Sequence, residues 1–365
     1  MTNKVLKLSF ISSVCIAVAL VAAVGFFAYQ TVMTPAGKGT AEVLFDIEPG
    51  DTLPRISAAL EEQQLIRSAR LFQYYVKFKG LGGQLKVGEY ALTQSMTPDQ
   101  IISVLISGRS VARKITFAEG LNVFDLVQIF EKNEIGTREE FFKLVYDKEF
   151  IRSLLGEELP SLEGYLYPET YQITKFESTR ALLTQMVRRF LQVWQLEIEP
   201  VAKNSGWTRN QIVTFASIVE KETGAAFERP LVSSVFHNRI HKKMRLQTDP
   251  TVLYGMAMKQ GKMPNNITRN DLLTPTPYNS YTNAGLPPTP IANPGKDALL
   301  ATLRPAKTNY IFFVSKNDGT HVFSETLQQH NQAVRDFQLN PKARENRSWR
   351  DLNQQPHQLN NKINK

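Results

Sequence analysis

Apolar residues dominate the chain first near its N-terminus. From Leu8 to Tyr29 there are 22 residues with neither charge nor proline. A helix of that length rises about 33 Å, and the hydrocarbon core of a bilayer is about 30 Å thick. Two lysines and no acidic residue precede this segment, which by the positive-inside rule keeps residues 1–7 in the cytoplasm. The pattern predicts a transmembrane anchor over residues 8–29.

A cleaved signal peptide is the alternative. Its apolar stretch is usually about 7–15 residues long, and no small-x-small cleavage site stands beyond Tyr29. An uncleaved anchor is therefore expected. Residues 30–41, which contain one proline and two glycines, predict a linker that leads into an extracytoplasmic part.

Short strand patterns followed by helix patterns then repeat over residues 42–135. Val43–Ile47 and Val87–Leu92 alternate like strands, and a third unit begins at Ile115. The turn Pro49-Gly50-Asp51-Thr52-Leu53 resembles the start of a LysM module, a small fold that binds glycans containing N-acetylglucosamine. The expectation for this region is a small LysM-like α+β domain.

The most informative helix pattern begins at Thr208, which forms a capping box with Gln211. Its apolar residues cover more than about 200° of the helix surface, so the helix is expected to be embedded. Glu220 falls within the apolar arc, and Glu222 lies about 200° around the helix from it. The two carboxylates therefore cannot form the facing pair of ordinary glycoside hydrolysis.

Two interpretations of Glu220 stay open at this point. A buried carboxylate needs a partner, and an ion pair with Arg229, Arg239 or Arg245 would supply one. Alternatively, partial desolvation would raise the pKa of Glu220 and fit it for general acid catalysis.

Composition narrows the classes of function. The 365 residues are 42% hydrophobic and 21% charged, which is ordinary for a globular chain, and the net charge of +9 favours anionic partners. The basic residues are dispersed, so a nucleic-acid partner is not expected.

The single cysteine, Cys15, excludes an internal disulfide. His237 and His241 have a metal-ligand spacing, but Asn238 stands where a zincin needs glutamate, so neither metal nor cofactor is expected.

Several motifs in fixed order carry a family resemblance. They are Glu163-Gly164-Tyr165-Leu166-Tyr167-Pro168-Glu169, Ile218-Val219-Glu220-Lys221-Glu222-Thr223, Leu246-Gln247-Thr248-Asp249-Pro250-Thr251, Tyr278-Asn279-Ser280-Tyr281, Gly285-Leu286-Pro287-Pro288 and Ala292-Asn293-Pro294-Gly295. With the anchor and the LysM-like region, the chain resembles the bacterial endolytic murein transglycosylases (MltG, YceG-like) from Leu8 to about Phe337.

The resemblance implies cleavage within peptidoglycan strands, at the bond from N-acetylmuramic acid to N-acetylglucosamine, leaving 1,6-anhydro muramyl ends. It places the acid/base role on Glu220. It also implies activity beside wall synthases (penicillin-binding proteins) that limits the length of nascent strands. A hydrolase with the same substrate and a non-catalytic wall-binding scaffold are the alternatives.

The other site candidates are polar or aromatic residues of the same motifs, each with a structural alternative. Asp249 followed by Pro250 is also typical of a helix N-cap. The motif Tyr278-Asn279-Ser280-Tyr281, which we call the tyrosine motif, is also compatible with loop packing. Glu163 is also compatible with a capping or surface role. The candidates for contact with sugar are Gln247, Thr248, Asp249, Tyr278, Asn279, Ser280, Tyr281, Glu163 and Tyr167.

The predicted fold class is α+β. The chain is expected to lie in the plasma (inner) membrane as a single-pass protein whose catalytic part is extracytoplasmic. The expected order is a cytoplasmic tail (1–7), anchor (8–29), linker (30–41), LysM-like domain (42–135), mixed α+β catalytic domain (136–340) and C-terminal tail (341–365).

Overall fold

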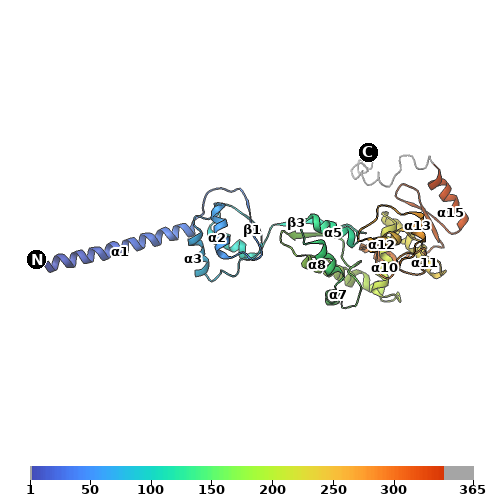
Figure 1. The fold of residues 1–365 in the computed structure, drawn as a ribbon, viewed down its shortest axis with the longest axis horizontal. Coiled ribbons are helices and arrows are strands. Elements are labelled where there is room, and N and C mark those ends of the chain that lie inside the picture. The colour runs from blue at the N-terminus through green and yellow to red at the C-terminus, as the bar shows by residue number, and fades with distance from the viewer. Residues whose placement is uncertain (1, 341–365) are drawn as a thin grey trace. The chain divides into compact units, whose positions relative to one another are not determined.

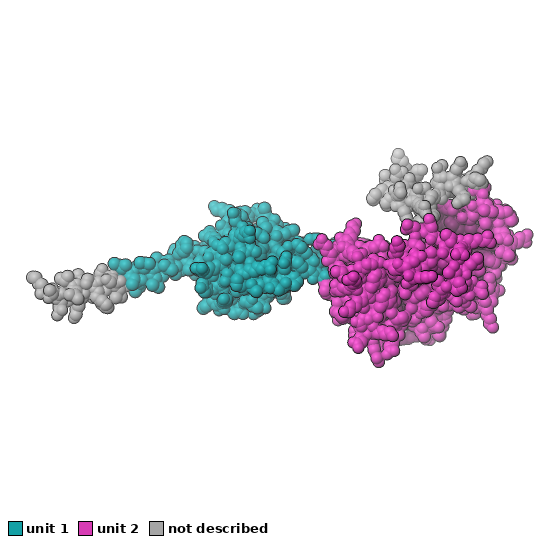
Figure 2. Space-filling view, viewed as in Figure 1, with its two compact units in different colours: residues 1–114, 172–177 teal, residues 115–171, 178–365 magenta. Residues whose placement is uncertain are grey.

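The computed structural model describes residues 2–340, with side chains in the N-terminal helix described from Cys15 onward. The predicted tail 341–365 lies outside the described residues. Contacts divide the chain into two compact units (Figure 2). Unit 1 holds the chain up to Lys114 together with Gln172–Glu177, and unit 2 holds Ile115–Tyr171 and the chain from Ser178 on. This division falls earlier in the sequence than the predicted boundary after residue 135.

Helix α1 (Thr2–Met33) is continuous and runs beyond the predicted anchor into the predicted linker (Figure 1). Its Cys15–Met33 segment is long and apolar enough to cross a membrane. Among its described side chains, only Ala28, Thr31 and Val32 are covered, fully or in part. Their spacing of three and four residues puts them on one side of the helix, and α1 contacts α3 and α4 of unit 1.

Unit 1 is a two-stranded antiparallel sheet covered by short helices. Strands β1 and β2 pair from Val43↔Leu92 to Ile47↔Gly88, and their inward side chains form a core with α2, α3 and α4. The elements are β1 (Val43–Ile47), α2 (Leu53–Glu62), α3 (Ala69–Phe78), β2 (Gly88–Leu92) and α4 (Pro98–Ser107). The two predicted strands are confirmed. Their pairing encloses α2 and α3 in a β-α-α-β order.

The third predicted strand–helix unit does not belong to this core. Strand β3 (Ala112–Thr116) pairs with β4 (Thr170–Thr174), and the division between the units falls within these two strands. The following helix, α5 (Val123–Lys132), opens with an Asn122 capping box and lies in unit 2.

Unit 2 is a mixed α+β unit in which helices predominate, as predicted for the catalytic part. Its remaining elements are α6 (Arg138–Val145), α7 (Lys148–Leu155), α8 (Thr179–Val193) with a π-helical turn (Trp194–Ile198), α9 (Glu199–Ala202), α10 (Arg209–Glu222), α11 (Arg229–His241), α12 (Asp249–Gln260), α13 (Arg269–Leu273), α14 (Lys296–Leu303), β5 (Phe312–Ser315), β6 (His321–Ser324) and α15 (Leu327–Val334). Strands β5 and β6 form an antiparallel hairpin.

Helix α10 is the centre of unit 2. The predicted Thr208–Gln211 capping box is present, and the eight residues from Ile212 to Val219 are all buried. Helices α11, α12 and α14 pack around it. The prediction of an embedded helix is confirmed.

Gly164 brings the Glu163–Pro168 segment close to α10. Its φ of +87° lies in the left-handed region that favours glycine. A Cβ at this position would stand 2.6 Å from the side chain of Pro290 and 2.7 Å from that of Val213. Both the backbone conformation and the available space therefore require glycine.

We expect Gly164→Ala to lower the free energy of unfolding by roughly 2–4 kcal/mol, because overpacking adds to backbone strain. Gly206→Ala is the matched control. Gly206 has a φ of +74°, and a Cβ added there would meet nothing within 4 Å, so only the strain of about 1 kcal/mol applies. Thermal and denaturant unfolding of both variants checks this, and equal losses would contradict the packing argument.

Candidate functional site

The C-terminal turn of α10 directs its two carboxylates to different surroundings, as predicted from the helical wheel. Glu220 lies among residues of the 119–120 and 293–297 segments and the start of α11. Glu222 lies against the segment that begins α12.

Glu220 is held in a buried ion pair. Its Oε1 accepts a hydrogen bond from Arg229 Nη2 at 2.8 Å, and its Oε2 accepts one from the Gly295 N–H at 3.0 Å. Only 5% of the Glu220 side chain and 9% of the Arg229 side chain are exposed. Of the three arginines proposed from the sequence, Arg229 is therefore the partner. Each of the two carboxylate oxygens of Glu220 therefore accepts one hydrogen bond.

Arg229 serves more than one carboxylate. It also donates to Glu119 Oε2 at 3.1 Å and lies 3.8 Å from Asp297 Oδ2. Burial, together with the charge of Glu220, raises the pKa of Glu119. The cluster joins the segment before α5, the end of α10 and the starts of α11 and α14.

Among the described residues, Glu222 has no such ion-pair partner. It accepts a hydrogen bond from the Thr248 hydroxyl, and burial raises its pKa to about 7. The nearby charge of Asp249 also raises this pKa, whereas the Thr248 hydrogen bond and the charge of Arg239 lower it. A carboxyl group that titrates near neutral pH is suited to both donating and accepting a proton.

Glu222 borders an open pocket of about 480 Å³, within the range of small-molecule sites. Four of the predicted site residues line it: Gln247, Thr248, Asp249 and Tyr281. The other lining residues are Arg239, Phe312, Phe313, Leu327, His330 and Asn331. The pocket therefore gathers residues from α10, α11, α12, β5 and α15.

Hydrogen bonds fix the wall that carries the predicted residues. The Tyr281 hydroxyl donates to Asp249 Oδ1 at 2.6 Å, and the Thr248 N–H donates to Ser280 Oγ at 2.9 Å. Gln247 is exposed and has a φ of +49°, a left-handed conformation that is costly for a non-glycine residue. Thr248 occupies the N-cap position of α12 without a side-chain capping hydrogen bond, so Asp249 lies at the first helical position and not at the expected N-cap.

The rest of the tyrosine motif supports this wall from within. Tyr278 is 9% exposed and hydrogen-bonded to Thr289, and Ser280 is 3% exposed. Asn279 is fully buried, and its amide donates to three backbone carbonyls, those of Asp271, Leu272 and Thr274. These positions favour packing over the predicted contact with sugar.

Glu163 and Tyr167 also lie away from the pocket. Glu163 is fully buried and accepts from the Val123 N–H, the Tyr254 hydroxyl and the Asn293 amide. Burial raises its pKa to about 8. Tyr167 is half-buried, with the Arg189 guanidinium 5.8 Å from the centre of its ring. Glu163 thus favours a structural role, joining α5, α12 and the Asn293 loop.

The opposite wall of the pocket includes Phe312 and His330, which the sequence did not predict as site residues. His330 stacks on Phe312 with ring centres 5.0 Å apart, and the Arg239 guanidinium lies 5.6 Å from the Phe312 ring. Arg239 is held by hydrogen bonds to the carbonyls of Ile311 and Leu246. Phe312 and His330 lie in no motif used above, and the hairpin β5–β6 with α15 brings them to the pocket, whereas Arg239, considered above as an ion-pair partner of Glu220, comes from α11.

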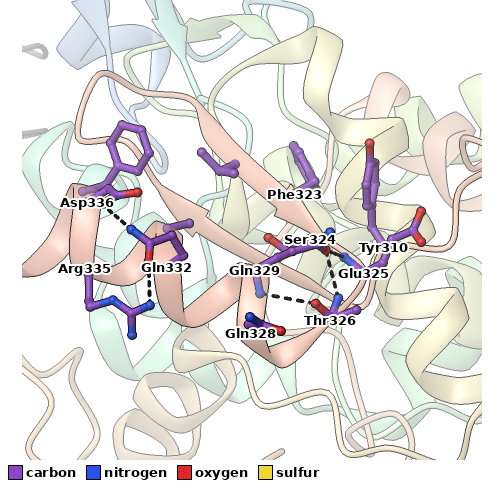
Figure 3. A pocket seen from close by; sticks show the side chains of 13 residues that line it. Tyr310, Phe323, Ser324, Glu325, Thr326, Gln328, Gln329, Gln332, Arg335 and Asp336 are labelled. Atoms are coloured by element: carbon purple, nitrogen blue, oxygen red, sulfur yellow. Dashed lines mark hydrogen bonds between the residues drawn. The ribbon is translucent and has the colours of Figure 1, made fainter.

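A larger hollow of about 1060 Å³ lies between the same hairpin and α15 (Figure 3). It is lined by polar side chains, including Gln328, Gln329 and Gln332. Its two acids, Glu325 and Asp336, are exposed, so neither has the desolvated carboxyl group that distinguishes Glu222.

The chain belongs to the YceG-like family, whose model matches residues 45–336, and the resemblance seen in the motifs is thereby confirmed. It is similar to an endolytic murein transglycosylase of Bacillus subtilis, with 33% identity over 330 residues that cover 85% of this chain and 89% of that protein.

Two further proteins extend the comparison. An endolytic murein transglycosylase of Streptococcus pneumoniae is 29% identical over 361 residues, and the match covers 89% of this chain but 64% of that longer protein. The crystal structure of a yceG-like protein from Listeria monocytogenes is 32% identical and aligns with a TM-score of 0.55, covering 80% of this chain and 98% of the other.

We expect Arg229→Met to lower the free energy of unfolding by about 3–5 kcal/mol, because it leaves Glu220 buried without its cation. Arg152→Met is the control. Arg152 pairs with Glu158 at 3.1 Å, but both side chains are more than two-thirds exposed, so the loss should stay below about 1 kcal/mol. Denaturant unfolding at pH 7 measures both, and equal small losses would contradict the structural role of the Glu220–Arg229 pair.

Proposed function

We propose that the chain is a membrane-anchored endolytic murein transglycosylase, a lyase that cleaves the N-acetylmuramic acid–N-acetylglucosamine bond within peptidoglycan strands. The observation that carries the proposal is the desolvated carboxyl group of Glu222 at a polar pocket, in a chain of the YceG-like family. The names of the relatives support the substrate.

The acid in this proposal is Glu222 and not Glu220, the residue expected from the sequence. A general acid needs a proton to give and an open path to the substrate. Glu222 has a pKa of about 7 and borders the pocket. Both oxygens of Glu220 accept hydrogen bonds, one of them from a guanidinium. The role of Glu220 as the acid remains the competing prediction.

The reaction needs one such group. Protonated Glu222 gives its proton to the departing glycosidic oxygen while the bond to the muramic C1 breaks. The resulting carboxylate then takes the proton from the C6 hydroxyl of the same muramic ring, whose oxygen attacks C1. The product is a 1,6-anhydro ring, no water is consumed, and the acid is restored for the next cycle.

The other pocket residues are suited to holding the sugar. Gln247 and Thr248 offer amide and hydroxyl groups beside the acid, and Tyr281 offers an aromatic face. Asp249 places a carboxylate, oriented by the Tyr281 hydroxyl, where it can offset the positive charge that develops at C1. No metal and no cofactor take part in this scheme.

The rest of the chain would place this chemistry at the membrane. Helix α1 serves as an uncleaved single-pass anchor that leaves both units on the extracytoplasmic side. Unit 1, with its β-α-α-β order, serves as a LysM-like module on the path of the glycan. Acting beside penicillin-binding proteins, the enzyme would cleave nascent glycan strands and so limit their length.

A second function is favoured by a specific observation. Asp249 shares the pocket with Glu222, so the two could act as acid and base on a water molecule, which would make the enzyme a hydrolase.

We expect Glu222→Gln to reduce release of muropeptides from sacculi by at least about 10³-fold, because the amide keeps the size of the side chain but has no proton to give. Glu220→Gln is the matched control and should retain most of its activity per folded molecule. Circular dichroism and thermal unfolding report the folded fraction. Loss of activity in folded Glu220→Gln alone would return the acid role to Glu220.

Mass spectrometry of the released fragments separates the two reactions. Products of the lyase are lighter by one water than those of a hydrolase. Release of fragments that carry only reducing muramic ends would contradict the lyase, and release of nothing by the wild type would favour a wall-binding scaffold.

We expect kcat to fall about tenfold per pH unit above pH 7, because the fraction of protonated Glu222 declines there. The folded-state pKa lies above the ordinary value, so stability derived from the neutral carboxyl group is present at low pH and is lost as the pH rises through 7. Glu222→Gln should therefore gain stability relative to the wild type between pH 5 and pH 8. A kcat that stays constant to pH 9 would contradict the assignment.

A further inference from the structure

Helix α3 of unit 1 carries an exposed face that no other described part of the chain covers. Tyr74 is 64% exposed and Phe78 is 90% exposed. Exposing two large aromatic side chains to water on one face of a helix is unfavourable in free energy. Arg70 and Lys77 are exposed on the same helix. At 100° per residue these four positions span an arc of about 100°, opposite the buried Phe72 and Val76. We call Arg70, Tyr74, Lys77 and Phe78 the α3 face.

The charges of this face are available. The ion pairs described in unit 1 use Arg55, Lys79, Arg113 and Lys175. Neither Arg70 nor Lys77 joins any ion pair in the described part of the chain.

The contact of α3 with the end of α1 bears on what this face meets. Helix α1 lies against α3 (Figure 1). Among the described side chains of α1, those that are covered are Ala28, Thr31 and Val32, at the end of the predicted membrane span. The headgroup region extends about 5–8 Å beyond the hydrocarbon core, so an element packed against this turn of α1 lies at its level. Aromatic rings flanked by Lys and Arg are typical of that depth, where the rings enter the acyl boundary and the cations meet phosphates.

We propose that the α3 face docks on the extracytoplasmic membrane surface and binds anionic phospholipid headgroups. Tyr74 and Phe78 insert at the acyl boundary, while Arg70 and Lys77 bind phosphate. The inference rests on the proposed anchoring by α1. The contact would hold unit 1 against the bilayer and so restrict how far it tilts about the end of the anchor.

Site-specific fluorescence on the full-length chain in proteoliposomes tests the proposal. The environment-sensitive probe NBD is attached at Phe78→Cys or at Ala58→Cys, each in a Cys15→Ser background. Ala58 is the matched control because it is exposed on α2 of the same unit. In vesicles of phosphatidylglycerol and phosphatidylethanolamine, NBD at position 78 should emit at shorter wavelength and be quenched by spin-labelled lipid at least about twofold more than NBD at position 58.

The native Cys15 separates failure of the inference from failure of anchoring. NBD on Cys15 of the otherwise unchanged chain should be quenched by lipid, since this residue lies in the apolar segment of α1. Quenching at Cys15 with equal, water-like emission at positions 58 and 78 would overturn docking and leave the face to a protein partner. No quenching at Cys15 would overturn anchoring itself. Emission from position 78 that is the same in phosphatidylcholine vesicles would overturn the binding of anionic headgroups by Arg70 and Lys77.

Discussion

The burial of α10 is the constraint on which the rest of unit 2 depends. Eight consecutive residues of this helix are enclosed, and two carboxylates follow them within three positions. A charged group removed from water without a partner is costly, so each carboxylate must be paired or become neutral. The fold uses both solutions. Glu220 is paired with Arg229. Glu222 accepts a hydrogen bond from the Thr248 hydroxyl, and its pKa is raised to about 7.

The Glu220–Arg229 ion pair has a structural role, because it joins segments that are far apart in sequence. Arg229 opens α11, Glu119 precedes α5, and Gly295, whose N–H bonds to Glu220, precedes α14. Glu163 performs a similar task deeper in the unit with uncharged donors only. These contacts connect the end of α10, which carries Glu222, to the starts of α11 and α14. In the proposed mechanism, such support would help to hold the proton-transferring group in place, since small displacements are costly in rate.

Much of this arrangement follows from local rules in the sequence. The apolar N-terminal run, the capping box at Thr208, and the divergence of Glu220 and Glu222 depend only on neighbouring residues, and the structure has all of them. The choice between an ion pair and an acid for Glu220 depends on where Arg229 lies, which is a matter of tertiary packing. Likewise, the tyrosine motif predicts four sugar contacts, but burial leaves Tyr281 as its one member at the pocket. Phe312 and His330 carry no motif, and their role is set by the return of the C-terminal hairpin.

The two walls of the pocket differ in how firmly they are built. The Gln247–Asp249 wall is held by backbone and hydroxyl hydrogen bonds to Ser280 and Tyr281, and it contains the strained backbone of Gln247. The opposite wall consists of Phe312, Leu327 and His330 from β5 and α15, whose contacts are chiefly with their own hairpin. Arg239 is the link between them, because it donates to Leu246 on one side and to Ile311 on the other. Its charge also acts on Glu222, so the residue that holds the walls together helps to set the proton affinity of the acid between them.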